Sequence, residues 1–402
     1  MKTILFVINT FGVGGGAEKA LLELLNQIDY QEYAVHLYVL TGQGDLIDQL
    51  PGEVKVLNRV YFPVSVLDCQ GKMRLMKTVW KAMTVRGTIF KRTGYLVKNL
   101  IAMIKAGNIR IEKLLWKILS DGGQRLEMEY DLAVAYLEGG SAYYVSSHVK
   151  ARQKAAFIHI DYRNAGYNRN LDEDCYLGFD HIFTVSESVR KAFLSVYSEC
   201  AQKTTVFYNL INREKIISKS REMGGFADEY DGFRILTVGR LVPQKAINVA
   251  IDTMKILKET GKPFRWYVLG EGELRKKLQE QICKMRLEEN FFLLGMVDNP
   301  YPYYAQCDLY VHTAQYEGKS VAIEEAQVLG CTILAVDHHG IQEQINDGID
   351  GRVCEFCPEI LAESIIDLFE HPKHMFDYAV AASEKEQTDY KEEIEKLLRL
   401  IL

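Results

Sequence analysis

The stretch Leu309-Tyr-Val-His-Thr-Ala-Gln-Tyr-Glu-Gly-Lys-Ser-Val-Ala-Ile-Glu-Glu-Ala-Gln-Val-Leu-Gly330 carries the clearest local pattern in the sequence. It predicts a buried strand over Leu309–His312, a polar loop, and a helix from about Ser320 to Leu329. Ser320 is placed to be the N-cap of this helix, and Gly330 is placed to end it. Strand, loop and helix in this order are typical of a parallel α/β sheet.

Two carboxylates flank the start of that helix: Glu317 lies in the loop and Glu325 lies two turns into the helix. A helix N-terminus presents unpaired N–H groups and partial positive charge, so it suits an anion. The carboxylates would accept hydrogen bonds from neighbouring hydroxyl groups. A nucleotide sugar fits this pattern, with its diphosphate at the amides and its hydroxyls at the carboxylates. The alternative is a solvated helix face, where a single Glu usually lies.

The same alternation of strands and helices continues through the chain in two sets. The first set predicts strands at 4–8, 35–40, 131–136, 154–158, 181–186 and 204–208, and the second at 234–238, 266–269, 291–294, 309–312, 333–336 and 352–354. Each set predicts a Rossmann-like, doubly wound parallel sheet, and two such domains would face each other across a cleft. We expect an N-terminal domain over 1–217, a linker at 218–232, a second domain over 233–383, and a C-terminal helix at 384–402 that packs back on the first domain.

A glycine-rich loop follows the first predicted strand. The residues Gly12-Val-Gly-Gly-Gly-Ala17 match G-x-G-x-x-A, the pattern of dinucleotide-binding turns. A nicotinamide-dependent dehydrogenase would place an acidic residue at the end of the next strand, but that strand ends in Leu40-Thr-Gly42. A loop that lets a bound sugar or phosphate approach the backbone is therefore the preferred interpretation, with a tight turn as the alternative.

Composition excludes several classes of protein. With 402 residues, 48% hydrophobic and 25% charged, the chain is typical of a soluble globular protein, and its net charge of -6 argues against a general nucleic-acid binder. We expect neither a signal peptide nor a spanning helix, because no apolar run is long enough. The eight cysteines are scattered, as in a reducing cytosol. Cys354 and Cys357 form one C-x-x-C pair that His338 and His339 could complete as a zinc site, although ordinary burial of the thiols is favoured.

Charge is distributed unevenly along the chain. Residues 72–117 contain twelve Lys or Arg and one acidic residue, Glu112, so this segment carries +11. Two parts have helical apolar spacing, and in the second of them Lys113 and Lys117 lie off the apolar stripe, with Trp116 near its border. Basic amphipathic helices suit an anionic membrane surface, and we expect this segment to contact one. The alternative is that the apolar stripes pack on the domain core.

A second cationic feature follows the first strand of the second set. In Gly239-Arg-Leu-Val-Pro-Gln-Lys245, the side chains of Arg240 and Lys245 lie at the carboxyl end of that strand, where ligands bind in parallel sheets. Arg and Lys there could neutralise a diphosphate and stabilise the charge that develops as a nucleoside diphosphate departs. An Asp-x-Asp pattern at 172–174 could bind a metal in a different architecture, but we interpret it as a solvated acidic turn.

These residues together resemble a known family. Arg240 and Lys245, the Glu317 and Glu325 pair, and Asn299-Pro-Tyr-Pro-Tyr303 are similar to the donor half of the retaining GT-B glycosyltransferases of family 4, also called group 1, which include transferases of capsule, exopolysaccharide and lipopolysaccharide synthesis. The resemblance is specific over 233–355 and looser before it. Thr313-Ala314 and His339-Gly340 depart from the family pattern, which leaves the donor sugar open.

The resemblance implies roles for individual residues. Arg240 and Lys245 would bind the diphosphate, Glu317 the hydroxyls of the donor sugar, and Glu325 the ribose. His159 would lie near the reacting carbon. The remaining donor-binding residues implied are Gly14, Gly15, Gly16, Asn209, Gly295, Met296, Val297, Gly318, Lys319, Ser320 and Val321. Glu138 and Asp161 would join His159 on the acceptor side.

The resemblance also implies a reaction and its partners. We expect transfer from a nucleotide sugar, with UDP as the nucleotide, to a lipid-linked or growing glycan, with retention at the anomeric carbon and with neither cofactor nor metal. We expect the protein in the cytoplasm, on the inner face of the cytoplasmic membrane, where partner glycosyltransferases could join it. The alternatives are a catalytically silent GT-B partner subunit or glycan-binding protein and, less favoured, the dehydrogenase.

Overall fold

The computed structural model describes residues 1–105, 107, 109–385 and 388–401. Residues 106 and 108 of the predicted basic segment, and residues 386, 387 and 402 of the predicted C-terminal helix, lie outside this description. The chain divides into two units, Met1–Leu210 with Thr388–Leu402, and Ile211–Gln387. Each unit is described by itself.

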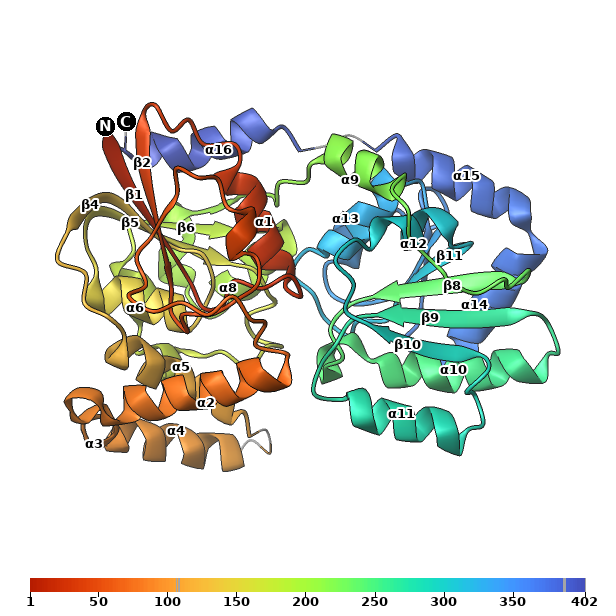
Figure 1. Ribbon diagram of the computed structural model, residues 1–402, viewed down its shortest axis with the longest axis horizontal. Coiled ribbons are helices and arrows are strands. Elements are labelled where there is room, and N and C mark those ends of the chain that lie inside the picture. Colours follow the sequence, from red (N-terminus) through yellow and green to blue (C-terminus); the bar gives the residue numbers. More distant parts are fainter. Residues whose placement is uncertain (106, 108, 386–387, 402) are drawn as a thin grey trace. The chain divides into compact units, whose positions relative to one another are not determined.

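The first unit is built on a seven-stranded parallel sheet with the strand order β3-β2-β1-β4-β5-β6-β7 (Figure 1). Its strands are β1 Lys2–Ile8, β2 Tyr33–Val39, β3 Lys55–Val56, β4 Glu129–Ala135, β5 Lys150–Ile158, β6 His181–Thr184 and β7 Thr204–Val206. Its α-helices are α1 Gly16–Leu25, α2 Cys69–Thr84, α3 Thr88–Lys91, α4 Thr93–Lys105, α5 Ile111–Gly122, α6 Gly140–His148, α7 Arg169–Asp172, α8 Glu187–Leu194 and α16 Tyr390–Leu398. The two-residue β3 was not predicted, because it is too short to show a pattern.

The second unit is built on a six-stranded parallel sheet with the strand order β10-β9-β8-β11-β12-β13. Its strands are β8 Phe233–Val238, β9 Phe264–Leu269, β10 Phe291–Gly295, β11 Leu309–His312, β12 Ile333–Val336 and β13 Arg352–Cys354. Its α-helices are α9 Arg213–Ser220, α10 Ile247–Glu259, α11 Arg275–Lys284, α12 Tyr301–Gln306, α13 Val321–Val328, α14 Pro358–Glu370 and α15 Pro372–Ser383.

Helices cover both faces of the second sheet. One apolar core joins the strands to α10, α11 and α14, and a second core on the opposite face joins them to α12 and α13. The strands are therefore buried on both sides, which explains why they are short continuous apolar runs in the sequence. This is the doubly wound arrangement predicted for both domains, and the prediction of the α/β class is confirmed.

In each sheet the strand order reverses at one place. In the first unit this place lies between β1 and β4, and in the second between β8 and β11. The loops after these strands diverge, so the carboxyl ends of the strands leave a crevice that ligands use in open parallel sheets. The glycine-rich loop follows β1, and the loops of Lys245 and Glu317 follow β8 and β11.

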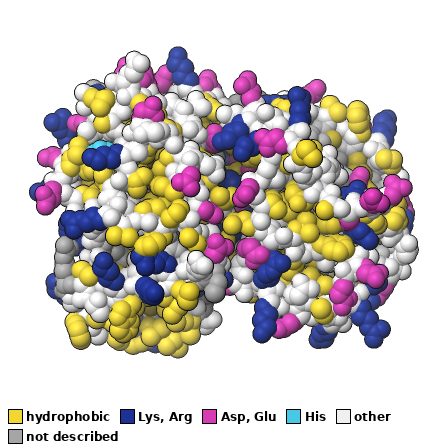
Figure 2. All heavy atoms as spheres, viewed as in Figure 1, with side chains coloured by type: hydrophobic (Ala, Val, Ile, Leu, Met, Phe, Trp, Pro, Cys, Tyr) yellow, Lys and Arg dark blue, Asp and Glu magenta, His cyan; other side chains and the backbone are white. Residues whose placement is uncertain are grey.

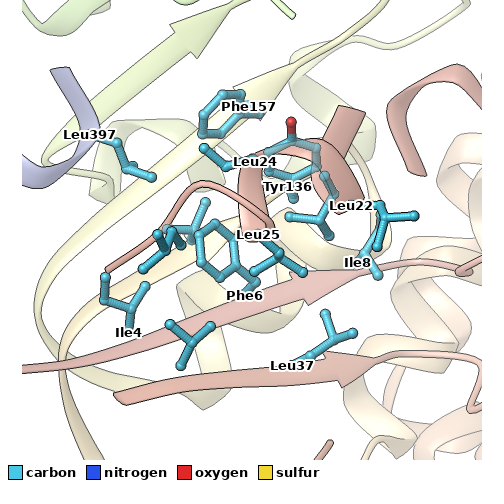
Figure 3. Packing of buried hydrophobic residues seen from close by; sticks show 14 of the residues in the cluster. Ile4, Phe6, Ile8, Leu22, Leu24, Leu25, Leu37, Tyr136, Phe157 and Leu397 are labelled. Atoms are coloured by element: carbon cyan, nitrogen blue, oxygen red, sulfur yellow. The ribbon is translucent and has the colours of Figure 1, made fainter. Parts of the chain in front are cut away.

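The C-terminal helix α16 belongs to the first unit. Leu397 is fully buried there, and Ile394 lies in the same apolar core as Phe157 of β5. Figure 3 shows Leu397 pointing toward the side chains around Phe157 and Leu24. Glu393 Oε2 also accepts a hydrogen bond of 3.1 Å from the backbone N–H of Tyr208. Apolar burial and this hydrogen bond hold the helix on the sheet.

The linker predicted at 218–232 is wrong, because the division falls earlier, between Leu210 and Ile211. The predicted segment begins inside α9 and belongs to the second unit. Phe226 packs on Tyr267, with ring centroids 4.5 Å apart, and Asp228 pairs with Arg265 at 2.8 Å. Glycines and charges suggested a free connection, but the apolar and ionic side chains between them anchor it to the sheet.

Among the residues described, none of the helices has both the length and the apolar character needed to cross a lipid bilayer.

Replacing Leu397 with Ala should destabilise the first unit by about 2–5 kcal/mol, because the change leaves a cavity at a site with no solvent exposure. Hydrogen exchange of the β1 and β5 amides under increasing denaturant measures this. Arg399→Ala, at a side chain that is 69% exposed, is the matched control and should shift stability by no more than about 0.5 kcal/mol. Equal exchange in both variants would contradict the packing of α16 on this sheet.

Candidate functional site

The stretch from Leu309 to Gly330 folds as its pattern predicts. The strand β11 is Leu309–His312, and α13 is Val321–Val328 with Ser320 as its N-cap. Gly330 has φ +65°, the left-handed conformation that glycine adopts most easily after a helix end. The backbone of Ser320 has N-cap geometry, but its side chain makes no capping hydrogen bond.

Three hydrogen bonds tie the loop after β8 to the loop after β11. Thr313 Oγ1 donates to the carbonyl oxygen of Lys245 at 2.7 Å, and the N–H of Gln315 donates to the carbonyl of Gln244 at 2.9 Å. Gln244 Nε2 donates in turn to the carbonyl of Tyr316 at 2.8 Å. Because β8 and β11 are neighbours in the sheet, residues about seventy positions apart form one continuous surface.

These hydrogen bonds between the two loops bring Lys245 and Glu317 together. Lys245 Nζ forms an ion pair with Glu317 Oε1, and the two side chains are only 15% and 13% exposed. Removing both charges from water costs free energy, so an ion pair with so little solvent contact must be held in place by the surrounding structure. The structure therefore brings together two residues that are separate features in the sequence.

Glu325 has a different set of partners. Its side chain is 3% exposed, and it accepts hydrogen bonds from Tyr301 Oη at 3.1 Å and from Tyr304 Oη at 3.3 Å. Burial raises the pKa of Tyr304 well above its usual value, so this phenol remains protonated and can donate. Both tyrosines lie in α12: Tyr301 belongs to the Asn299-Pro-Tyr-Pro-Tyr303 motif, and Tyr304 is the residue directly after it.

One amide of the predicted anion site is already occupied. The N–H of Ser320 donates to Gln344 Oε1 at 2.7 Å, and Gln344 Nε2 donates to the carbonyl of Ser320 at 2.9 Å. The prediction that the Ser320 amide is open to a phosphate is therefore wrong, because a buried glutamine side chain caps it. Gly318 is also buried, Val321 is partly buried, and Lys319 Nζ pairs with Glu324 Oε1 at 2.6 Å.

The remaining predicted residues of the second unit are placed around these groups. Arg240 follows β8, and its side chain is exposed. Gly295 ends β10 with φ +85°, and its carbonyl accepts a hydrogen bond of 2.7 Å from the N–H of Gly270. Met296 and Val297 follow it and are partly buried, with Val297 packed against the core that contains α12 and α13.

In the first unit, the glycine-rich loop joins β1 to α1. The N–H of Val13 donates to Asp45 Oδ1 at 2.8 Å, and the N–H of Gly15 donates to the carbonyl of Gly12 at 3.3 Å, which closes a turn. Gly14, Gly15 and Gly16 all lie outside the left-handed backbone region. Other residue types can adopt this backbone conformation. A need for positive φ in the turn therefore does not explain why these three positions are glycine.

Glu138 and His159 lie at neighbouring strand ends and contact each other. Glu138 Oε2 accepts a hydrogen bond of 3.1 Å from the N–H of His159. Burial lowers the pKa of His159 to about 3, so its imidazole is neutral at physiological pH. Asn209 follows β7 and is 3% exposed. Asp161 instead accepts hydrogen bonds from its own loop, at 3.2 Å from the N–H of Arg163 and at 3.1 Å from that of Asn164.

The basic face predicted for the helix at 111–119 is wrong. Lys117 is 3% exposed, and its Nζ pairs with Glu173 at 2.9 Å, while Lys113 Nζ lies 3.7 Å from the centre of the Tyr167 ring. Burial lowers the pKa of Lys113 to about 8. These lysines turn inward because α5 packs on α6, so the outward basic surface of segment 72–117 belongs to α2, α3 and α4.

The solvated acidic turn predicted at 172–174 is also wrong for Asp172. This residue has no solvent exposure, and it accepts hydrogen bonds from Tyr143 Oη at 2.8 Å and from Tyr197 Oη at 3.3 Å. Burial raises its pKa to about 7, against the opposing effect of these hydrogen bonds. Its aromatic partners are more than twenty residues away in the sequence, so no local pattern reveals them.

Two histidines near Lys245 and Glu317 were not predicted to belong to this site. His312 at the end of β11 and His338 just after β12 are both buried, and the Nε2 atom of each has no hydrogen-bond partner within the described chain. A polar residue directly after a short apolar strand was the available signal. No group of three or more His, Cys, Asp or Glu in the described residues is arranged to hold a metal ion, and the zinc alternative with Cys354 and Cys357 gains no ligand set.

The chain is similar in sequence to known proteins over part of its length. Residues 223–396 match the family described as "Glycosyl transferases group 1". The N-acetylgalactosamine-N,N'-diacetylbacillosaminyl-diphospho-undecaprenol 4-alpha-N-acetylgalactosaminyltransferase of Campylobacter jejuni is 30% identical over 193 residues, 48% of this chain and 51% of the relative. The amylovoran biosynthesis glycosyltransferase AmsK of Erwinia amylovora is 28% identical over 203 residues, 48% of this chain and 49% of the relative. The chain spans about half the length of the curated relatives it matches.

A solved structure matches along the whole chain. Anabaena HepE, in complex with UDP and glucose, superposes with a TM-score of 0.69 and covers 99% of each chain at 18% identity. At this identity the similarity shows only that the two proteins share a fold. The shared fold includes the first unit of this chain as well as the second.

Stability of the first unit should fall as pH rises from about 4 to 7, because the native state holds the Asp172 proton more tightly than the unfolded chain does. Above pH 7 this contribution is constant. Asp172→Asn keeps an acceptor oxygen and removes the charge, so the variant should gain stability relative to the wild type at pH 8 but not at pH 4. Urea denaturation at both pH values measures this. Asp174→Asn, at a side chain that is 51% exposed, leaves Asp172 in place, so this control should keep the wild-type fall in stability with pH.

Proposed function

We propose that the chain transfers a sugar from a nucleotide-sugar donor to a glycan or lipid-linked acceptor. The match of residues 223–396 to the glycosyl transferases group 1 family model and the GT-B fold of two Rossmann-like units support this proposal. The observation that carries the proposal is the ion pair of Lys245 and Glu317, with little solvent exposure, at the point where the strand order of the second sheet reverses. A cation for the diphosphate and a carboxylate for hydroxyls lie side by side where parallel sheets bind ligands.

The donor would contact these groups through its charged and hydroxyl-bearing parts. Lys245, with the exposed Arg240 on the same loop, would neutralise the diphosphate, and Glu317 would accept hydrogen bonds from the sugar. Glu325, held by Tyr301 and Tyr304, would accept hydrogen bonds from the ribose. We propose UDP as the nucleotide; the HepE complex with UDP and glucose, which shares the fold, supports this choice.

The proposed reaction is substitution at the anomeric carbon with retention. The bond from that carbon to the diphosphate oxygen breaks, and the bond to the acceptor oxygen forms on the same face. The acceptor proton moves to the departing diphosphate, so no metal or protein base is required. Lys245 favours this step because negative charge grows on the leaving oxygen. His159, a neutral imidazole, Glu138 and Asp161 remain the residues proposed for the acceptor side.

Replacing Lys245 with Ala should lower the rate of sugar transfer by about a hundredfold or more, since a charged contact to the diphosphate is lost. Glu317→Gln should lower it comparably by weakening recognition of the sugar. Donor consumption and glycan formation in the presence of membranes measure both. Lys255→Ala and Glu259→Gln, which disrupt an exposed ion pair of 2.8 Å in the same unit, are matched controls and should retain wild-type rates.

Two outcomes would separate the possibilities. Full activity in both site variants would refute the assignment of Lys245 and Glu317. A wild-type protein that gains no thermal stability from any nucleotide sugar would favour the catalytically silent partner subunit, because ligand binding to the native state raises its stability.

We also propose that α2, α3 and α4 contact an anionic membrane surface, where the protein would meet lipid-linked acceptors and partner glycosyltransferases. Trp80 and Phe90 are 71% and 83% exposed, and other apolar side chains beside them are exposed as well. Lys77, Lys81 and Lys91 lie among them, exposed, and Figure 2 shows hydrophobic side chains gathered with Lys and Arg over these helices. Exposed apolar side chains mixed with cations suit insertion beside anionic headgroups.

The triple variant Lys77→Gln, Lys81→Gln and Lys91→Gln should bind vesicles containing phosphatidylglycerol much more weakly, since each cation near such a surface is worth about 1 kcal/mol. Trp80→Ser with Phe90→Ser should weaken binding by at least about tenfold through lost apolar burial. Co-sedimentation measures both. Phe376→Ser, at a phenylalanine of α15 that is 68% exposed, is the control. Unchanged binding in both sets of variants would refute the membrane role.

A further inference from the structure

The imidazole of His312 lies next to the carboxylate of Glu317. His312 ends β11 and is 1% exposed, and its Nε2 lies 3.9 Å from Glu317 Oε1. That oxygen is the same one that pairs with Lys245 Nζ. The Nε2 atom itself has no hydrogen-bond partner in the described chain. A buried polar atom without a partner costs stability, so its presence beside a candidate ligand-binding carboxylate calls for a physical reason.

The surroundings of His312 fix its protonation. Burial lowers its pKa well below the usual value, and the charge of Lys245 and the neighbouring His338, whose ring lies 6.1 Å away, act in the same direction. The imidazole is therefore neutral and carries one proton. Its Nδ1 lies 3.2 Å from Tyr310 Oη, and burial raises the pKa of Tyr310, so the phenol keeps its proton and can donate it to Nδ1. With the phenol as donor to Nδ1, the imidazole proton is on Nε2, the atom that faces Glu317.

The donor changes the demands on Glu317. A diphosphate carries more negative charge than one carboxylate, so it competes with Glu317 for Lys245. If Lys245 turns to the diphosphate, Glu317 keeps its charge at a side chain that is 13% exposed and loses its cation. A buried charge without a partner is costly, and a hydrogen-bond donor within reach would offset that cost.

We propose that His312 is a positioning residue, which donates its Nε2–H to Glu317 and fixes this carboxylate for recognition of the donor sugar when the diphosphate engages Lys245. The inference rests on the proposed function of the second unit. The 3.9 Å separation closes to a hydrogen bond of about 2.9 Å by a small rotation of Glu317. His312 thereby acts on the sugar only through Glu317.

The diphosphate of UDP alone already draws Lys245 from Glu317, whereas only the sugar also depends on the orientation of Glu317, so His312 should matter more for a UDP-sugar than for UDP. In His312→Leu the affinity for a UDP-sugar should fall by about tenfold to a hundredfold, and the affinity for UDP should fall clearly less. Calorimetry with UDP, and with whichever of UDP-glucose, UDP-galactose, UDP-N-acetylglucosamine and UDP-N-acetylgalactosamine binds the wild type most tightly, measures this. Equal losses for UDP and the UDP-sugar, or no loss, would overturn the proposal.

Two polar variants keep the test decisive if the leucine variant does not fold. His312→Gln places an amide N–H near the position of Nε2 and should restore most of the affinity for the UDP-sugar. His312→Asn retains a partner for Tyr310 Oη but is too short to reach Glu317, so it should behave like leucine. Equal behaviour of the glutamine and asparagine variants would overturn the proposal.

A double-mutant comparison tests the route through Glu317. In a Glu317→Gln background, the further change His312→Leu should alter the affinity for the UDP-sugar by less than about twofold, because the charge to be stabilised is gone. Independent, additive losses would overturn the proposal. Failure of the wild type to bind any of these nucleotide sugars would refute the proposed function itself, whereas normal wild-type binding with unaffected His312 variants would refute the role of His312 alone.

Discussion

The second unit depends on one constraint: a lysine and a glutamate with little solvent contact must be kept side by side at the ends of β8 and β11. The energy of this pair is small once desolvation is counted, so the surrounding structure has to hold it. Hydrogen bonds from Thr313 and Gln315 to the loop of Lys245 do this, together with the parallel register of the two strands. The geometry is therefore set by the sheet, and the charged groups are free to exchange partners without unfolding the loops.

The buried polar groups around the pair differ in how many of their polar atoms have a hydrogen-bond partner. Glu325 accepts hydrogen bonds from two phenols, the N–H of Ser320 donates to Gln344, and the Nε2 atom of His312 faces Glu317 with no hydrogen-bond partner in the described chain. A carboxylate held in place by two phenols suits a contact that does not change during a reaction, such as one to a ribose. An unsatisfied donor beside an ion pair suits a contact that forms only when the cation is drawn away.

The charged side chains of the first unit lie in two different environments. Lys117 and Asp172 are buried in the interior near α5, whereas the cations of α2, α3 and α4 are exposed among apolar side chains. The excess positive charge of segment 72–117 therefore has two different roles. Part of it pairs with carboxylates of the same unit, as Lys117 does with Glu173, and part of it is available to an anionic surface. Charge counting alone treats these two parts as one.

The sequence by itself determined the α/β class, the strands β8 to β13, the helix boundaries around Ser320 and Gly330, and the pair of carboxylates Glu317 and Glu325. These features are local: apolar runs, capping residues and spacing along one helix fix them within about twenty residues. Only the tertiary structure decided that Lys245 meets Glu317, that Gln344 occupies the Ser320 amide, that Lys113 and Lys117 turn inward, that Phe226 anchors the expected linker, and that His312 faces a carboxylate. Most of these contacts join residues distant in the chain, and all of them depend on strand order and on which helix face is covered, neither of which is written in any short stretch of sequence.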